Sequence, residues 1–223
     1  MEYIKLFDTT AQYNAYTADT TNFILPNVSV AKDAPTTVHY NPLSPTPPTP
    51  TYESVDLGLP SGTLWAKWNV GATSETEYGN YYQYGKGADD YSVTSGQSDY
   101  SGTENPLATS ADTVAQVWGG SWHMPTQAQF YELTANTNYT WTTIDGVNGG
   151  KFANKTDATK YVFFPAAGRW SDGSQYYVGS RGYYWSSTPN DSGYAYNLYF
   201  RNGNDGVNYC GRDYGCSVRG VLG

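Results

Sequence analysis

The sequence predicts an α+β fold in which two short helices precede an irregular antiparallel sheet that runs to the C-terminus. Segments 113–118 and 126–133 carry helix start signals and apolar residues at helical spacing. After residue 139, short alternating segments are separated by turn residues, as in β-hairpins. A proline-rich segment at 41–51 separates this main domain, residues 52–223, from a small N-terminal unit.

The N-terminal unit, residues 1–40, is too short to bury a stable core by itself. We therefore expect it to attach to its own copies, to the main domain or to another protein. Because proline favours the polyproline II conformation, the linker at 41–51 is expected to be a semi-rigid spacer. A spacer of this kind suits a protein that is anchored at one end and displays the other.

The main domain is predicted to open with a strand. Leu64, Ala66 and Trp68 alternate with polar residues, which is typical of a half-buried strand. The β pattern continues over residues 79–85. Residues 86–109 are rich in Gly, Ser and Asp, and they predict a long surface loop.

The first helix is predicted over residues 113–118. Ser110 or Asp112 can cap its start, and Gly119 with Gly120 forms a stop signal after it. Three apolar side chains of this helix are expected to face the core: Val114, Val117 and Trp118.

The second helix begins with a capping box, in which Thr126 is the N-cap and Gln129 the third helical residue. Its Phe130 and Leu133 are expected to face the core. His123 stands just before this helix, and no acid–base partner is recognisable beside it. We interpret His123 as a packed or hydrogen-bonded residue rather than as a catalyst.

The rest of the chain predicts β-hairpins. Segments 139–144 and 150–154 flank an Asp-Gly turn signal at Asp145. Segment 160–170 is the most apolar and is expected to be the central strand. Further strands are expected at 176–178, 182–185 and 194–201, and the closing strand is expected to begin at Ser217–Arg219.

Composition narrows the classes of function. The formal net charge is −8, and no Lys/Arg cluster is present, which argues against binding to nucleic acids or anionic membranes. No apolar run approaches the length of a transmembrane helix. The first residues lack the basic and apolar regions of a secretory signal, so we expect synthesis in a cytoplasm, with release by lysis as for a virion part.

The two cysteines, Cys210 and Cys216, are interpreted as incidental surface thiols. They could pair only in a tight loop, and two cysteines do not make a disulfide scaffold. With only two histidines, both remote in sequence, they do not form a zinc site. The sequence therefore predicts no metal site and no cofactor.

Residues 183–216 have an unusual composition. Tyr, Asn, Gly, Ser and Asp occupy 23 of these 34 positions, a bias also seen in antibody paratopes. After Trp185 the chain contains no Lys, Glu, Gln, Met or Trp, although the first 185 residues contain 29 of them. Mutation of the adenines in an AAC or AAT codon cannot produce those five residues. It does produce Tyr, Asp, Ser, Gly, Cys, Arg and Val from Asn.

Five phrases carry a resemblance to a known family: LWAKWNVGA (64–72), WGGSWHMPT (118–126), FPAAG (164–168), GYYWSS (182–187) and SVR (217–219). Together they resemble the formylglycine-generating-enzyme-like branch of the C-type-lectin fold over residues 52–223. Within that branch the chain resembles variable proteins of diversity-generating retroelements from gut bacteria and phages. The resemblance implies a C-type-lectin fold with a variable region at about 183–216, where adenine-templated mutagenesis diversifies a ligand-binding surface.

The resemblance implies a receptor-binding or adhesion protein on a phage or prophage-derived particle, whose ligand is a bacterial surface protein or glycan. The N-terminal unit would join copies of the chain or a virion partner. Along strand 194–201, Leu198 and Phe200 should face inward and the alternate residues outward. The expected ligand-binding residues are Asn190, Ser192, Tyr194, Tyr196, Asn197, Tyr199, Arg201, Asn204, Asp205, Asn208, Tyr209, Arg212, Asp213 and Tyr214.

Two alternatives remain. The namesake enzymes of the branch use a cysteine pair near the C-terminus, which Cys210 and Cys216 could supply. A catalytic thiol needs a lowered pKa, however, and only Arg212 is near in sequence. We therefore expect no enzymatic activity. The tyrosines could instead serve assembly in a structural surface module. Calcium-dependent sugar binding needs a cluster of oxygen ligands, and its Glu-Pro-Asn and Trp-Asn-Asp motifs are absent.

Overall fold

The structure, a computed structural model, describes residues 52–88 and 100–223 and is of the α+β class. The expected attachment unit (1–40) and linker (41–51) lie outside the described residues. The described elements, in chain order, are β1 (Ser54–Asp56), β2 (Leu64–Asn69), α2 (Thr113–Val117), α3 (Gln127–Asn136), β3 (Thr137–Ile144), β4 (Val147–Asn154), β5 (Tyr161–Pro165), β6 (Arg169–Ser171), β7 (Ser174–Tyr176), β8 (Arg181–Pro189), β9 (Tyr194–Arg201), β10 (Asn204–Gly211) and β11 (Arg219–Leu222).

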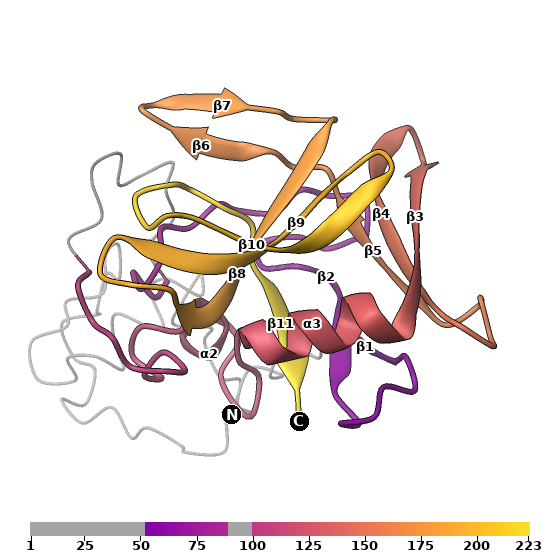
Figure 1. The fold of residues 1–223 in the computed structure, drawn as a ribbon, viewed down its shortest axis with the longest axis horizontal. Coiled ribbons are helices and arrows are strands. Elements are labelled where there is room, and N and C mark those ends of the chain that lie inside the picture. Colours follow the sequence, from indigo (N-terminus) through magenta and orange to yellow (C-terminus); the bar gives the residue numbers. More distant parts are fainter. Residues whose placement is uncertain (1–51, 89–99) are drawn as a thin grey trace, which may run out of the picture. The chain divides into compact units, whose positions relative to one another are not determined.

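The described strands form small antiparallel sheets with the orders β1-β2-β11, β10-β9-β8, β3-β4-β5 and β6-β7. The first sheet joins the beginning and the end of the domain, because β11 pairs with β2 (Figure 1). The closing strand therefore begins at Arg219, two residues after the predicted start. Ser217 and Val218, which precede it, are fully buried.

Strand β2 confirms the predicted strand, but its expected one-sided burial is wrong. Trp65 is fully buried and packs in one core cluster, which includes Phe130 and Phe164. Ala66 is buried on the opposite face in a second core cluster. The simple alternation fails because β2 is the middle strand of its sheet and has a core on both faces.

Both helices start where the sequence predicts. Asp112 caps α2, and its carboxylate accepts a hydrogen bond from the Ala115 N–H. Thr126 and Gln129 form the capping box of α3. The expectation for Val117 is wrong, since this side chain is 39% exposed. Of the three apolar side chains expected to face the core, Val114 and Trp118 do so, because they lie one turn apart on the same face of this short helix.

The β3–β4 hairpin turns at Asp145 and Gly146 as predicted, with a positive φ at both residues. The apolar segment at 160–170 is not central, because β5 is an edge strand beside β4. Its burial comes instead from packing against β2 and from a side-chain donor to the carbonyl of Phe163. The strand expected at 176–178 is also displaced, since β7 ends at Tyr176.

Residues 79–85 do not form the expected strand. Tyr82 makes a single isolated bridge to Cys216, and the Tyr84 N–H donates to the carbonyl of Arg212. Because the partner segment is itself irregular, these hydrogen bonds do not build a regular ladder. Tyr81, Tyr82 and Tyr84 are nevertheless buried.

Arg219 fixes β11 inside the domain. Its side chain is fully buried. Its three guanidinium nitrogens donate to Asn69 Oδ1 (2.9 Å), the Ala66 carbonyl (2.9 Å) and the Phe163 carbonyl (2.8 Å). Burial lowers the pKa of Arg219 to about 10, so the group stays charged at neutral pH. One side chain thereby connects β11 to β2 and to the free edge of β5.

Candidate functional site

The predicted variable region builds the sheet β8-β9-β10. The β6–β7 hairpin lies on one side of this sheet and helix α3 on the other (Figure 1). Leu198 and Phe200 of β9 share a core cluster with Phe130 and Leu133 of α3, as the sequence predicts. Helix α3 therefore packs against one face of the sheet. Other residues of β9 and β10 reach the surface.

The first group of predicted binding residues is a tyrosine cluster of Tyr194, Tyr196 and Tyr209. In the β9–β10 register Tyr209 lies opposite Tyr196. The Tyr209 ring stands edge-on to Tyr194 and Tyr196, with centroids 5.8 and 6.5 Å apart. Tyr194 is 48% exposed and Tyr209 54% exposed, so this cluster offers aromatic surface to a ligand.

The second group lies on the opposite face of the sheet, because side chains alternate along a strand. Tyr199 and Arg201 of β9 lie opposite Tyr183 and Arg181 of β8. The rings of Tyr183 and Tyr199 are 5.3 Å apart. The fourteen predicted residues therefore do not form one continuous patch, since the pleat divides them between two faces.

The exposure of the predicted site residues varies. The exposed ones are Asn190, Ser192, Tyr194, Arg201, Asn204, Asn208 and Tyr209. The half-buried ones are Tyr196, Tyr199, Asp205, Asp213 and Tyr214. Asn197 and Arg212 are buried, so the expectation that their side chains are exposed on the binding surface is wrong.

Arg212 is a structural residue. Its guanidinium donates to the carbonyls of Tyr100 (3.2 Å), Gly102 (2.8 Å), Tyr194 (3.3 Å) and Asp191. It also lies over the Tyr84 ring, 5.0 Å from its centroid. An arginine in a polar loop predicts exposure, but here loop carbonyls surround the guanidinium and satisfy its donors. Arg212 thus holds together the loops that carry exposed site residues.

Asn197 is buried because it belongs to a thiol site on the face of the sheet opposite to helix α3. Its Nδ2 donates to Cys210 Sγ at 2.8 Å, and Cys210 Sγ lies 3.9 Å from Cys216 Sγ. The expectation of surface thiols is wrong, since Cys216 is fully buried and Cys210 is 8% exposed. The chain turns inward there, with Cys210 opposite Ala195 and Cys216 bridged to Tyr82.

Both thiols are free and buried, and the surroundings of Cys216 disfavour its ionisation. Burial, followed by the hydrogen bond between the two thiols, raises the pKa of Cys216 well above its ordinary value. Asn197 Oδ1 and Ser217 Oγ are also buried, and neither has a hydrogen-bond partner among the described residues. The arrangement therefore combines a Cys216 thiol whose ionisation is disfavoured with two buried oxygen atoms that lack hydrogen-bond partners among the described residues.

Sequence reasoning missed the residues of the β6–β7 hairpin that adjoin the second face. Arg169 lies over the Tyr214 ring at 3.8 Å, and Arg181 lies over the Tyr177 ring at 3.9 Å. Tyr176 and Tyr177 are 43% and 40% exposed. Arg169, Tyr176, Tyr177 and Arg181 precede the segment of biased composition. The signal that could have found them is the consecutive aromatic pair in a short hairpin.

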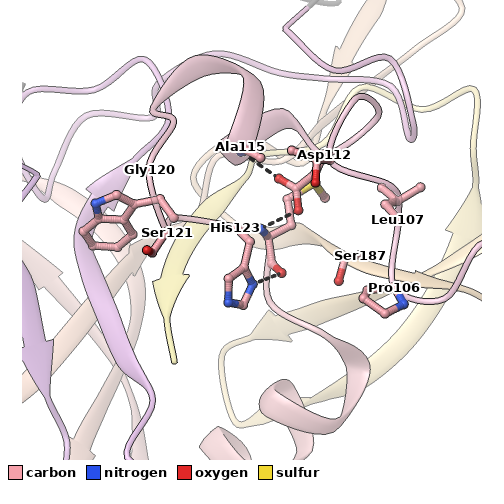
Figure 2. Close-up of a pocket in the computed structure, with 11 residues that line it drawn as sticks. Pro106, Leu107, Asp112, Ala115, Gly120, Ser121, His123 and Ser187 are labelled. Atoms are coloured by element: carbon pink, nitrogen blue, oxygen red, sulfur yellow. Dashed lines mark hydrogen bonds between the residues drawn. The ribbon is translucent and has the colours of Figure 1, made fainter. Parts of the chain in front are cut away.

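A separate pocket of about 290 Å³ lies beside α2 (Figure 2). Asp112 faces it, but its carboxylate already accepts from the N–H groups of Ala115 and Met124 at 2.9 Å each. Burial raises the pKa of Asp112 despite these donors. His123 contacts the carbonyls of Met124 (3.0 Å) and Gly223 (3.1 Å) through its two ring nitrogens, in agreement with a structural role.

The hydrogen bonds of Asp112 and His123 limit the acid–base chemistry that this pocket can perform. Among the described residues, no hydrogen bond joins His123 to Asp112 or to Ser187, which also lines the pocket. In residues 52–88 and 100–223, His, Cys, Asp and Glu do not gather in threes to form a metal-binding group. Neither described helix is long and apolar enough to cross a membrane.

The comparisons with known proteins address the same region. A family model described as a domain of unknown function (DUF8237) matches residues 136–221. The match contains strands β3 to β10, hence both faces of the β8-β9-β10 sheet and the thiol pair. No curated protein and no solved structure is significantly similar to the chain.

Proposed function

We propose that this chain is a variable protein of a diversity-generating retroelement, with a C-type-lectin fold of the formylglycine-generating-enzyme-like branch. Two helices early in the domain, followed by small antiparallel sheets, support this proposal. The pairing of the last strand with β2 supports it further, because such closure holds the framework together independently of the exposed loops.

The observation that carries the proposal is the separation of exposed from buried positions within 183–216. Exposed positions of this segment carry residues that adenine mutagenesis can produce, including Ser192, Asn204, Asn208 and Tyr209. Interleaved positions such as Leu198 and Phe200 form the core. A surface of this kind can change without loss of the fold, because exposed substitutions usually alter stability by no more than about 0.5 kcal/mol.

The proposed role is receptor binding or adhesion on a phage or prophage-derived particle, at a bacterial surface protein or glycan. Residues 1–40 would attach the chain to its copies or to a virion partner, and residues 41–51 would space the binding domain from that attachment. Repeated display would raise the apparent affinity of a modest binding surface by roughly 10² to 10⁴.

The DNA that follows the coding sequence tests this proposal. It should contain a reverse-transcriptase gene and an imperfect repeat of the 3′ coding sequence. The two copies should differ chiefly where the repeat has adenine, and those differences should fall on codons of exposed residues. A genomic neighbourhood without such a repeat would contradict the proposal.

A matched pair of asparagines tests the division between exposed and buried positions. Asn208 and Asn197 lie opposite one another in the β9–β10 register, but only Asn197 is buried. Asn208→Asp should change the free energy of unfolding by less than about 0.5 kcal/mol. Asn197→Asp should lower it by about 2–3 kcal/mol at pH 7, because a buried carboxyl must either ionise without a partner or take up a proton. Urea unfolding measures both, and equal effects would contradict the division.

A second candidate function rests on the thiol pair. Two thiols 3.9 Å apart near the C-terminus favour an oxidase of the formylglycine-generating type. The raised pKa of Cys216 opposes it, because a catalytic cysteine must reach the thiolate form.

Thiol alkylation distinguishes the proposed ligand-binding function from the oxidase function. With iodoacetamide at pH 7.5, both cysteines should react at least tenfold more slowly in the native protein than in urea, since only exposed thiolate reacts. Cys210 and Cys216 are best resolved by mass spectrometry of the labelled peptides. Rapid native labelling of Cys216, together with oxygen-dependent conversion of a cysteine-containing peptide, would support the oxidase instead.

A further inference from the structure

Three arginines converge on one face of the β8-β9-β10 sheet. All five arginines of the chain lie between residues 169 and 219. Arg212 and Arg219 are buried and satisfied by hydrogen bonds to protein oxygens. The other three are Arg169, Arg181 and Arg201, and they lie around the second face described above.

Arg181 and Arg201 are direct partners across β8 and β9, so their side chains project from the same face. Like charges in this position destabilise a sheet. Among the described residues, the only ion pair joins Lys67 and Glu53, so no carboxylate compensates the two guanidinium groups. This local positive charge contrasts with the net charge of −8, and a bound anion would relieve the repulsion between the two guanidinium groups.

Arg169 adds a third positive group on the same side. It lies 5.9 Å from the Tyr177 ring centroid and 5.4 Å from that of Tyr183, while Arg181 covers Tyr177 at 3.9 Å. Arg169 Nε is buried without a hydrogen-bond partner among the described residues. The aromatic rings hold the guanidinium groups in place, which reduces the entropy lost when they bind a ligand.

The surroundings of these arginines are largely aromatic. Tyr176, Tyr177 and Val178 are consecutive and are each 40–43% exposed. The rings of Tyr176, Tyr177, Tyr183 and Tyr199 form a continuous row, with successive centroids 6.2, 6.2 and 5.3 Å apart. Tyr and Arg are the residue types that dominate binding energy in protein interfaces.

We propose that this face docks an acidic segment of a partner protein. Asp or Glu carboxylates of the partner would lie on Arg181 and Arg201, and its apolar side chains would pack on Tyr176 and Val178. Guanidinium groups bind carboxylates through paired hydrogen bonds. The exposed Val178 matches an apolar side chain better than the hydroxyls of an acidic polysaccharide. The inference rests on the proposed function and specifies its ligand as a protein. Arg169, Arg181 and Tyr176–Val178 precede the variable region, so they would supply a constant part of the site.

Selection from a random 12-residue peptide library displayed on phage tests the proposal. The full chain is immobilised, and the same selection is run on Arg181→Gln/Arg201→Gln and on the control Lys155→Gln/Lys160→Gln. The control removes the same charge from two exposed lysines on the β4–β5 connection. Peptides enriched on the wild type and on the control should combine Asp or Glu with apolar residues. The double arginine variant should not enrich them.

Affinity for a synthetic peptide of the enriched sequence should fall at least tenfold in the double arginine variant and less than twofold in the control. Replacement of its acidic residues by amides should cause a similar loss, and higher salt should weaken binding. Arg181→Lys/Arg201→Lys should retain part of the affinity, because lysine keeps the charge but not the paired geometry.

Enrichment of neutral peptides, absence of enrichment or indifference to the arginine substitutions would overturn the proposal. Arginine-dependent binding of polygalacturonate without peptide binding would assign the face to acidic glycans instead. The two proposals fail separately. A retroelement repeat beside the gene without acidic-peptide binding contradicts only the docking inference. Arginine-dependent peptide binding without a repeat contradicts only the proposed function.

Discussion

Replacement of Arg219 by alanine is expected to lower the free energy of unfolding by about 4–5 kcal/mol. The substitution leaves Asn69 Oδ1 and the carbonyls of Ala66 and Phe163 without their donors. Each buried acceptor left unpaired costs about 1–3 kcal/mol. It also opens a cavity beside the Phe164 ring, which lies 4.5 Å from the guanidinium. The melting temperature should fall by roughly 8–20 °C.

Two further variants make this measurement specific. Arg219→Lys should cost about 2–3 kcal/mol, since one ammonium group cannot replace donors on three nitrogens. Arg201→Ala removes an exposed arginine and should change stability by less than about 0.5 kcal/mol. Thermal unfolding followed by circular dichroism measures all three. If Arg219→Ala melted within two or three degrees of the wild type, the closing strand would not depend on this hydrogen-bond network.

Gly168→Ala is expected to cost about 3–4 kcal/mol and to displace the β6–β7 hairpin. Gly168 has a φ of +65°, and a Cβ there would lie 2.1 Å from the Tyr176 carbonyl oxygen and 2.7 Å from the Val178 nitrogen. Both obstacles are backbone atoms, so relief requires movement of the segment that carries Tyr176 and Val178. Binding of acidic peptides should therefore weaken together with stability.

Gly173→Ala separates the cost of a positive φ from the cost of the steric overlap with backbone atoms. Its φ is +73°, but a Cβ at this position would meet nothing within 4 Å. Only the backbone conformation is penalised, so the cost should be about 1–2 kcal/mol, with little effect on peptide binding. Urea unfolding and peptide titration of both variants provide the comparison. Equal costs at the two glycines would show that the close approach of Gly168 to β7 is unimportant.

Local signals predicted the elements that depend on neighbouring residues. The Thr126 capping box, the Asp112 cap and the turn at Asp145 lie where the sequence placed them. Each depends on a hydrogen bond or a backbone angle within a few residues, which a short segment encodes by itself. The predicted central position of segment 160–170 was wrong, since β5 is an edge strand. Apolar composition indicates that a strand is buried, but it does not indicate which strands pair with it.

The candidate site was predicted less completely. Composition predicted the segment, and alternation placed Leu198 and Phe200 correctly in the core. Asn197 obeys the same alternation but is buried, because both faces of β9 are covered along part of its length. Alternation predicts which side chains of a strand are buried and which are exposed only when one face of the strand is open to solvent.

Residue order was enough to predict the α+β class, the helix starts, the first hairpin turn and the concentration of tyrosine and asparagine near the C-terminus. The burial of Arg212 and Cys216, and the division of the tyrosines between two faces, became visible only in the folded domain. The same is true of the pairing of Arg181 with Arg201. Those facts depend on strand register and on contacts between residues far apart in the chain, such as Arg212 with Tyr100, and no local pattern encodes either.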